Sequence, residues 1–338
     1  MPELPHIEEI TLSEWNTCWQ RLPQANLLQS WQYGTAKEEA EGWRALRFLF
    51  SDVNRRPLAI AQVLTRGVPL IGGIARMNRG PLFLETLPED ESIRTYLAAL
   101  QSFLVAARRR RWWIVQVAPE LPNTDETCVG LKNLGCYRRP DPVWASGRLS
   151  LEAGDEAILM GFNGKWRNSM RKGLRTGVLV TNHNGTGPEL DLLIRHYAVL
   201  QQSKDFDGLS EGMIKSLARQ QGSEWQFNIF IAREKDAPES DEPIGFLVTV
   251  RHGDSATYVI GTTNEKGRNL QANSVLLWQA ILHAKHTGCL WFDIGGLSAA
   301  TPKGIAQFKQ GLNAIPYALV GEWRWYNLPR LMNKARMR

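Results

Sequence analysis

One predicted order of secondary structure occurs twice along this chain, and that repeat limits the folds open to it. In residues 44–68, apolar and polar residues alternate on both sides of an Asn-Arg-Arg-Pro turn, which predicts a β-hairpin. Apolar spacing then predicts a helix over 90–108, and β-branched and aromatic residues predict a strand over 112–119. The segment MNRGPLFL (77–84) lies between the hairpin and this helix, so the first half predicts a hairpin, a strand, a helix and a strand.

The second half predicts the same order without repeating any words of sequence. Residues 226–253 read as strand, polar turn and strand, and 255–264 as a third strand. A helix with one apolar face over 273–286 and a strand over 289–296 follow. We predict an α+β fold of two similar lobes, each a mixed β-sheet flanked by helices.

The strand–helix–strand crossovers match the GNAT acyltransferase lobe, so a tandem pair of GNAT-like lobes is expected. The length of 338 residues agrees with two domains. We place the first lobe at 1–147, with the C-terminal segment 318–338 packing back on it, and the second lobe at 148–317.

Composition narrows the function without choosing it. The net charge of +6 favours polyanionic partners such as RNA, nucleotide diphosphates or an anionic membrane face. The four cysteines and six histidines are scattered, so no metal site or disulfide framework is expected. The start MPELPHIEE has no signal-peptide character, and no apolar stretch approaches about 18 residues. We therefore expect a cytoplasmic protein.

The basic segment FNGKWRNSMRKGLRTGV (162–178) is the most distinctive part of the chain. Three arginines recur at helical spacing, on one face: Arg167, Arg171 and Arg175. Asn163 could cap this helix and Gly177 could end it. Three apolar residues would anchor it: Met170, Leu174 and Val178. The arginine row could grip phosphates or form a solvated basic face, and both interpretations stay open.

The segment 258–281 predicts a strand, a polar loop and a helix. In CoA-dependent acyltransferases an R-x-x-G-x-G/A pattern at this helix start binds the pyrophosphate on backbone amides. Here Arg268 is followed by Gln271 and Asn273 where the small residues would stand. We expect the Gln271 side chain to obstruct a pyrophosphate, which argues against acyl-CoA as the donor.

The segment 291–314 ends a strand at Gly295 and Gly296 in a sharp turn. Phe308 and Lys309 follow in a short amphipathic stretch closed by Gly311. A lysine there could neutralise a developing oxyanion or hold a phosphate.

Four segments in this order resemble the Fem family. They are QSWQYGTAKEEAEGW (29–43), the basic segment, FDIGG (292–296) and GIAQFKQGLN (304–313). The family moves amino acids from aminoacyl-tRNA onto a peptidoglycan precursor held between two GNAT-like lobes. The resemblance covers nearly the whole chain and implies an aminoacyltransferase, similar to enzymes of class EC 2.3.2. Its long helical arm is absent here, as in a minimal form.

The resemblance implies specific substrate-binding residues. Lys37 looks like the lysine that contacts the nucleotide-sugar diphosphate. Arg167 looks like the matching arginine, with Arg171 as the competing choice. Tyr258 lies where the family has a substrate-binding tyrosine.

The resemblance also implies Phe308 and Lys309 as the catalytic pair near the aminoacyl-acceptor end. Lys309 would supply the cation for the oxyanion when an amine attacks the aminoacyl ester. The motif before the two glycines departs from the family's commoner Tyr-Asp-Phe style, and we expect Asp293 to be a buried structural carboxylate. The sequence shows no Ser-His-Asp order or cysteine beside a histidine that would supply a general base.

The implied partners are aminoacyl-tRNA, as co-substrate without another cofactor, and a UDP- or lipid-linked muropeptide or other amine acceptor. A GNAT-like N-acyltransferase using an acyl thioester in exopolysaccharide or secondary-metabolite biosynthesis is the alternative. A non-enzymatic RNA-binding module is a third hypothesis, without a supporting motif. The basic, partly apolar segment 328–338 could touch the inner face of an anionic membrane or form a solvated final helix. We favour a monomer.

Overall fold

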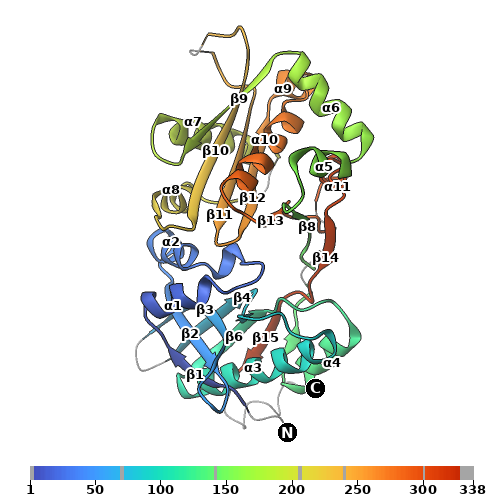
Figure 1. Ribbon diagram of the computed structural model, residues 1–338. Helices are drawn as coiled ribbons and strands as arrows, with labels where there is room; N and C mark the ends of the chain where they lie inside the picture. The colour runs from blue at the N-terminus through green and yellow to red at the C-terminus, as the bar shows by residue number, and fades with distance from the viewer. Residues whose placement is uncertain are drawn as a thin grey trace. The chain divides into compact units, whose positions relative to one another are not determined.

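The computed structural model describes residues 4–68, 72–140, 143–204, 208–238, 241–299 and 301–327. The chain forms two compact units (Figure 1). Unit 1 holds Met1–Trp144 together with Ala318–Arg338, and unit 2 holds Ala145–Tyr317. The segment 328–338, for which we considered a membrane contact or a final helix, lies outside the described residues.

Unit 1 is built on one mixed sheet with the strand order β1-β2-β3-β4-β6-β15-β7, and β5 pairs with β3. Its strands are β1 His6–Glu9, β2 Arg44–Ser51, β3 Pro57–Val68, β4 Gly72–Asn78, β5 Leu82–Phe83, β6 Trp112–Ala118, β7 Tyr137–Arg138 and β15 Trp323–Tyr326. Its helices are α1 Leu12–Trp19, the 3-10 turn η1 Leu27–Gln29, α2 Trp31–Glu41, α3 Glu89–Arg109 and α4 Asp125–Asn133. The strands β1 to β4 are antiparallel, whereas β4 and β6 are parallel and are joined through α3.

Unit 2 has a second mixed sheet with the order β14-β8-β13-β12-β11-β10-β9. Its strands are β8 Ala145–Ser150, β9 Val178–Asn184, β10 Trp225–Glu234, β11 Gly245–His252, β12 Ser255–Thr263, β13 Trp291–Asp293 and β14 Ile315–Ala318. Its helices are α5 Asp155–Gly161, α6 Gly164–Arg175, α7 Pro188–Lys204, α8 Glu211–Arg219, α9 Glu265–Asn269, α10 Ala272–His286 and α11 Lys303–Gln310. The strands β9 to β12 are antiparallel, and β12 runs parallel to β13 through the α10 crossover.

The predicted repeat is confirmed. Each unit has an antiparallel hairpin, a further strand, a long helix and a strand parallel to the one before that helix. The α+β class with two mixed sheets flanked by helices is therefore the observed fold. The strand predicted over 289–296 is shorter than expected, because it ends at Asp293 and Gly295 takes the left-handed φ of 72°.

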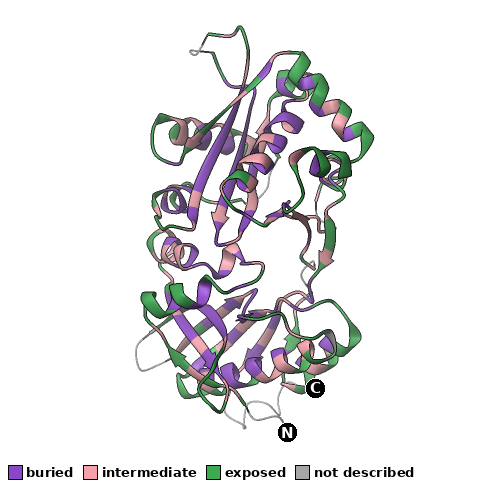
Figure 2. Ribbon diagram, viewed as in Figure 1, coloured by how far each residue is buried: buried purple, intermediate pink, exposed green. Residues whose placement is uncertain are grey.

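The helix α10 lies at the centre of the unit 2 core. Its predicted apolar face is buried, and so are Val275 and Trp278 outside that face. The reason is that α6 packs on α10, and a Cβ added to Gly173 of α6 would lie 2.5 Å from Val275 Cγ2. Figure 2 shows α10 and the strands β10 and β11 largely buried, while α6 exposes much of its surface.

The predicted anchor of the basic helix was partly wrong. Met170 is buried as expected, but Leu174 is 47% exposed and Val178 belongs to β9 rather than to the helix. Trp166 and Gly173 complete the buried face of α6 instead. The spacing of apolar residues alone is compatible with burial of either the Leu174 face or the Trp166 face of α6. The contact with α10 decides that the Trp166 face is buried.

Among the described helices, none combines the length and the apolar character required to cross a lipid bilayer.

Candidate functional site

Lys309 is a buried lysine near the end of α11 in unit 2. Its residue surface is only 5% exposed, and its Nζ lies 3.4 Å from the carbonyl oxygen of Gly296. The same Nζ stands 4.6 Å from the centre of the Tyr258 ring, a cation–π distance. Burial lowers the pKa of Lys309 to about 8, while the charge of Asp293 acts in the opposite direction. A lysine in this state can act as a cation at neutral pH and lose its proton just above it.

Tyr258 is presented by an irregular part of β12. The pairing of β12 with β11 shifts at this point, so that Val259 is an extra residue beside Tyr258. Such a β-bulge re-aims neighbouring side chains. The ring then extends over Gly261, where an added Cβ would lie 1.7 Å from the Tyr258 hydroxyl oxygen. Burial raises the pKa of Tyr258 to about 12, so the phenol is neutral beside the lysine.

A carboxylate lies at the end of β13, beside the turn that carries Gly296. Oδ1 of Asp293 accepts hydrogen bonds from Ser146 Oγ (2.6 Å) and from the Gly295 amide (2.8 Å). Oδ2 accepts from the Tyr317 hydroxyl (2.5 Å), and the Arg148 guanidinium lies 4.6 Å from the centre of the Tyr317 ring. The carboxylate is therefore partly buried and held from three directions, in general agreement with the expected structural role.

Phe308 has a different position from its neighbour Lys309. Its ring packs on the Trp166 ring of α6, with the centroids 6.1 Å apart. The contact joins α11 to the basic helix, so Phe308 fixes the helix that carries the lysine. The structure thus brings Tyr258 to Lys309, whereas the ring of Phe308 packs on Trp166.

The arginines of α6 have unequal roles. Arg167 Nη1 donates to the carbonyl oxygens of Met160 (2.9 Å) and Phe162, which end α5. Arg171 and Arg175 are exposed. The helix starts with Asn163, whose side chain accepts from the Lys165 amide as predicted. Arg171 therefore has the freer guanidinium of the two candidate arginines.

The loop before α10 is occupied by side chains where a CoA-dependent enzyme has small residues. Gln271 is the N-cap of α10 in the left-handed conformation, with φ 63°, and its Nε2 donates to the Arg268 carbonyl (3.1 Å). Asn273 Nδ2 donates to Thr263 Oγ1 (3.1 Å). Both side chains stay over the loop, and a pyrophosphate would have to displace them.

Lys37 lies in unit 1 and lines a pocket of about 390 Å³. Aromatic and charged side chains share the lining, among them Tyr33, Trp43, Arg76, Arg79 and Trp144. Each of the three cations forms an ion pair with a carboxylate. The Lys37 Nζ lies 2.6 Å from Glu41 Oε1. The Arg76 Nη2 lies 2.5 Å from Glu322 Oε1, and the Arg79 Nη2 lies 2.9 Å from Glu120 Oε1. The volume is within the usual range for ligand sites.

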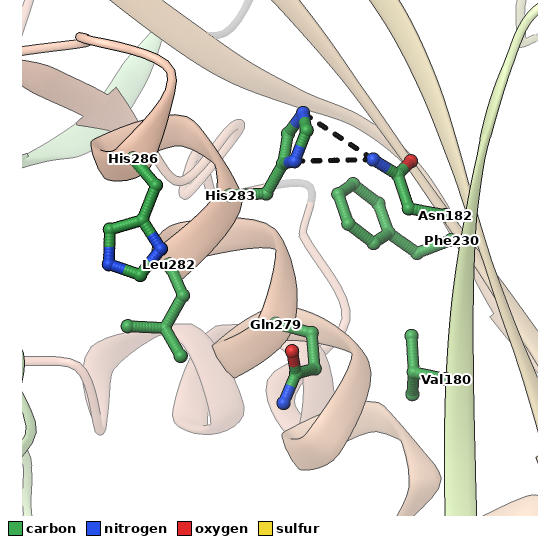
Figure 3. Close-up of a pocket in the computed structure, with 7 residues that line it drawn as sticks. All are labelled: Val180, Asn182, Phe230, Gln279, Leu282, His283 and His286. Atoms are coloured by element: carbon green, nitrogen blue, oxygen red, sulfur yellow. Dashed lines mark hydrogen bonds between the residues drawn. The ribbon is translucent and has the colours of Figure 1, made fainter.

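A smaller pocket of about 260 Å³ lies between α10 and the strands β9 and β10 of unit 2 (Figure 3). The Asn182 amide faces the His283 ring at 3.2 Å, with Phe230 beside them. Burial, followed by the charges of His286 and Arg251, lowers the pKa of His283. The residues predicted for the site do not line this pocket, so we place the candidate site at Lys309.

Sequence reasoning missed Ser146, Arg148 and Tyr317. They come from β8 and β14, about 150 and 20 residues from Asp293 in the chain, and no local motif marks them. In the part of the chain that the structure describes, no group of three or more histidine, cysteine or carboxylate side chains is placed to hold a metal ion.

Comparison with known proteins identifies a domain family within unit 2. Residues 162–310 match the family described as acetyltransferase (GNAT) domain. No curated protein matches the chain. The matched range contains the GNAT crossover of unit 2 together with Tyr258, Phe308 and Lys309.

Several solved structures of similar fold cover nearly the whole chain, including both units. The crystal structure of FemX has a TM-score of 0.76 at 15% identity, covering 98% of this chain and 100% of that chain. A tandem GNAT protein from the clavulanic acid biosynthesis pathway has a TM-score of 0.55 at 11% identity, covering 96% and 99%. L-PGS from Bacillus licheniformis has a TM-score of 0.53 at 13% identity, covering 97% and 95%. The chain therefore has a two-lobed GNAT-like fold, and the domain match supports an acyltransferase activity.

Proposed function

We propose that this protein is an aminoacyltransferase that moves an amino acid from aminoacyl-tRNA to an amine of a peptidoglycan precursor or similar peptide. The acceptor would be a UDP-linked or lipid-linked muropeptide, and the product an amide. The observation that carries the proposal is the buried Lys309 amine, held between the Gly296 carbonyl and the Tyr258 ring in the GNAT-like unit. Because burying a lysine is costly, a cation in this position suits a task in charge stabilisation.

The chemistry is aminolysis of an ester. The neutral acceptor amine attacks the aminoacyl carbonyl, a C–N bond forms, and the oxyanion develops beside the Lys309 ammonium. The ester C–O bond then breaks, and the ribose oxygen of the tRNA leaves with the proton that the amine gives up. By analogy with other oxyanion donors, one such cation contributes about 3 kcal/mol. Alignment of the amine with an already activated ester lowers the barrier further.

The choice of donor rests on the loop before α10. Gln271 and Asn273 occupy this loop with hydrogen-bonded side chains, which disfavours a CoA pyrophosphate at the helix start. The resemblance of the sequence motifs to the Fem family implies aminoacyl-tRNA as the donor. Arg171, exposed on α6, is available for tRNA or acceptor phosphates.

The acceptor diphosphate would bind at Lys37. The unit 1 pocket combines this lysine with Arg76 and Arg79, and its aromatic walls suit a sugar or base. Binding requires that the diphosphate compete with Glu41 for the ammonium.

The second candidate is an N-acyltransferase that takes an acyl thioester from CoA or a carrier protein. The fold shared with the tandem GNAT protein of the clavulanic acid pathway favours it. In that case the acceptor is a sugar amine or a small amine of a biosynthetic pathway.

One incubation separates these functions. The protein is mixed with charged total tRNA and a UDP-muropeptide, and the product is read by mass spectrometry, with RNase-treated and acyl-CoA reactions in parallel. We expect a product that carries an aminoacyl mass increment and that does not form after RNase treatment. The rate of its formation should be at least about 100-fold lower in a Lys309→Ala protein. Product formed from acyl-CoA in an RNase-treated reaction would reverse the choice of donor. An unchanged rate in the Lys309→Ala protein would exclude the lysine from the mechanism.

A further inference from the structure

Asp293 is connected to Lys309 through a short run of backbone. The Gly295 amide donates to Asp293 Oδ1 at 2.8 Å, and Ser146 Oγ lies 2.9 Å from the Gly295 carbonyl oxygen and 2.6 Å from the same Oδ1. The next residue, Gly296, supplies the carbonyl oxygen that lies 3.4 Å from Lys309 Nζ. The carboxylate therefore holds the Gly295 amide directly, and the Ser146 hydroxyl lies between Oδ1 and the Gly295 carbonyl oxygen, sharing its one proton between these two acceptors. These contacts tie the turn on which the lysine rests to Asp293.

Gly295 makes this turn possible. Its φ of 72° lies in the left-handed region, and an added Cβ would lie 2.8 Å from the Tyr258 carbonyl oxygen and 3.1 Å from Lys309 Nζ. The turn, the tyrosine and the lysine are thus in direct contact, with no room for a side chain between them. A shift of the turn would move the amine.

Several elements of unit 2 place charged, polar or apolar groups beside Lys309. From β12 it faces the neutral phenol of Tyr258, from β13 the carboxylate of Asp293, and from its own helix the apolar Phe308. Arg148 on β8 is the cross-strand partner of Asp293, and its guanidinium also lies over the ring of Tyr317 on β14. Asp293 is the group whose charge raises the pKa of Lys309 against the effect of burial.

We propose that Asp293 is a positioning residue for Lys309, which places the amine through the Gly295–Gly296 turn and keeps it protonated through its own negative charge. This role rests on the proposed function and goes beyond a structural carboxylate. It also differs from general base catalysis. Both oxygens of Asp293 already accept hydrogen bonds from Ser146, Gly295 and Tyr317, so the carboxylate is not directed at the proton of an attacking amine.

Two kinds of variant separate charge from position. Asp293→Asn removes the charge but keeps an oxygen that can accept from the Gly295 amide. Ser146→Ala and Tyr317→Phe keep the charge and each remove one hydrogen bond. Asp155→Asn is the matched control, because it removes a carboxylate of the same unit that pairs with His286 at 3.0 Å on the surface.

The first readout needs no substrate. The protonation of Lys309 is followed by NMR on protein with ¹³C-labelled lysine, assigned with Lys309→Arg. We expect the titration midpoint to move down by about one pH unit in Asp293→Asn, and to stay within a few tenths of a unit in Asp155→Asn, Ser146→Ala and Tyr317→Phe. An equal midpoint in Asp293→Asn and Asp155→Asn would overturn the electrostatic half of the proposal.

The second readout is the rate of aminoacyl transfer against pH. The transfer rate should decline at alkaline pH as Lys309 loses its proton, and in Asp293→Asn this decline should shift to lower pH together with the NMR midpoint. At pH 7.5 the rate of Asp293→Asn should then be about threefold lower than that of the wild type. Ser146→Ala should lower kcat without moving that decline, and an unchanged kcat there would overturn the positional half. If no transfer occurs from aminoacyl-tRNA, the proposed function fails, while the NMR titration still decides whether Asp293 controls the lysine.

Discussion

The Nζ of Lys309 stands 4.6 Å from the centre of the Tyr258 ring, and this ring shields the cation from water on one side. The two residues lie about 50 positions apart, and Tyr258 stands at the bulge in β12. A desolvated cation–π contact contributes up to about 2 kcal/mol. The ring therefore both buries the amine and partly compensates its charge.

The ring of Tyr258, rather than its hydroxyl, should support the lysine. We expect Tyr258→Phe to retain transfer within about threefold, and Tyr258→Leu to lower kcat by about 10-fold or more because the cation–π contact is lost. Steady-state kinetics with both variants would check this. A loss in Tyr258→Phe equal to that in Tyr258→Leu would instead assign the function to the hydroxyl.

Local patterns predicted much of the fold. The hairpin of β2 and β3, the helix α10 and the short amphipathic segment that forms α11 all follow from alternation or helical spacing within short windows. The exposed Leu174 was wrongly predicted to be buried, because the buried face of α6 depends on its partner α10.

The surroundings of Asp293 could not be predicted in this way. Ser146 and Tyr317 reach the carboxylate only because the sheet has the order β14-β8-β13, which joins strands far apart in the chain. No local pattern encodes that order. The motif identified the lysine, whereas the tertiary fold supplies the groups that hold it.

Replacing Lys309 by methionine should stabilise the protein while removing its activity. The folded state holds this lysine with a pKa of about 8, below the ordinary value of 10.5. Between these two values the unfolded chain binds more protons than the folded one, so stability should rise with pH across that range. Below about pH 8 the folded state holds a charged, buried amine, and this lowers the free energy of unfolding. Lys309→Met should therefore raise the free energy of unfolding by about 1–3 kcal/mol at pH 7.

Urea denaturation at pH 7 and pH 10 would measure both effects. The wild-type protein should gain stability relative to Lys309→Met as the pH rises. A methionine variant less stable than the wild type at pH 7 would show that the lysine is needed for folding rather than retained for function.

An alanine at Gly295 should damage both stability and activity. The added Cβ would approach the Tyr258 carbonyl oxygen to 2.8 Å in a left-handed conformation, and we expect a loss of about 1–3 kcal/mol with a lower kcat. Gly304→Ala in α11 is the control, since a Cβ there meets nothing within 4 Å and should be neutral or slightly stabilising. Thermal unfolding of the two variants gives the comparison, and equal melting temperatures would contradict a strained turn.

The two candidate arginines of α6 should separate into a structural and a binding residue. Arg167→Ala removes the donor to the carbonyls that end α5 and should cost about 1 kcal/mol of stability. Arg171→Ala changes an exposed side chain and should alter stability by less than about 0.5 kcal/mol.

If Arg171 contacts a phosphate of the tRNA, its loss should weaken tRNA binding and reduce the dependence of binding on salt. Fluorescence anisotropy with labelled tRNA at two salt concentrations would show this, and the exposed Lys172→Ala serves as a charge-matched neighbour. Equal binding by Arg171→Ala and the wild type would leave the arginine row as a solvated face.

Freeing Lys37 should strengthen the binding of a diphosphate in unit 1. Glu41 holds the Lys37 ammonium at 2.6 Å, and a bound diphosphate has to displace it. We expect Glu41→Gln to tighten the binding of a UDP-sugar by about three- to tenfold, because the competing charge is removed. Glu39→Gln makes the same charge change at an exposed position of the same helix and should have a smaller effect. Isothermal titration calorimetry with UDP-N-acetylmuramate measures both, and Lys37→Ala should abolish the gain in the double variant. If Glu41→Gln binds no more tightly than Glu39→Gln, the diphosphate does not contact Lys37, and the pocket with its paired charges would fit an acceptor without a diphosphate.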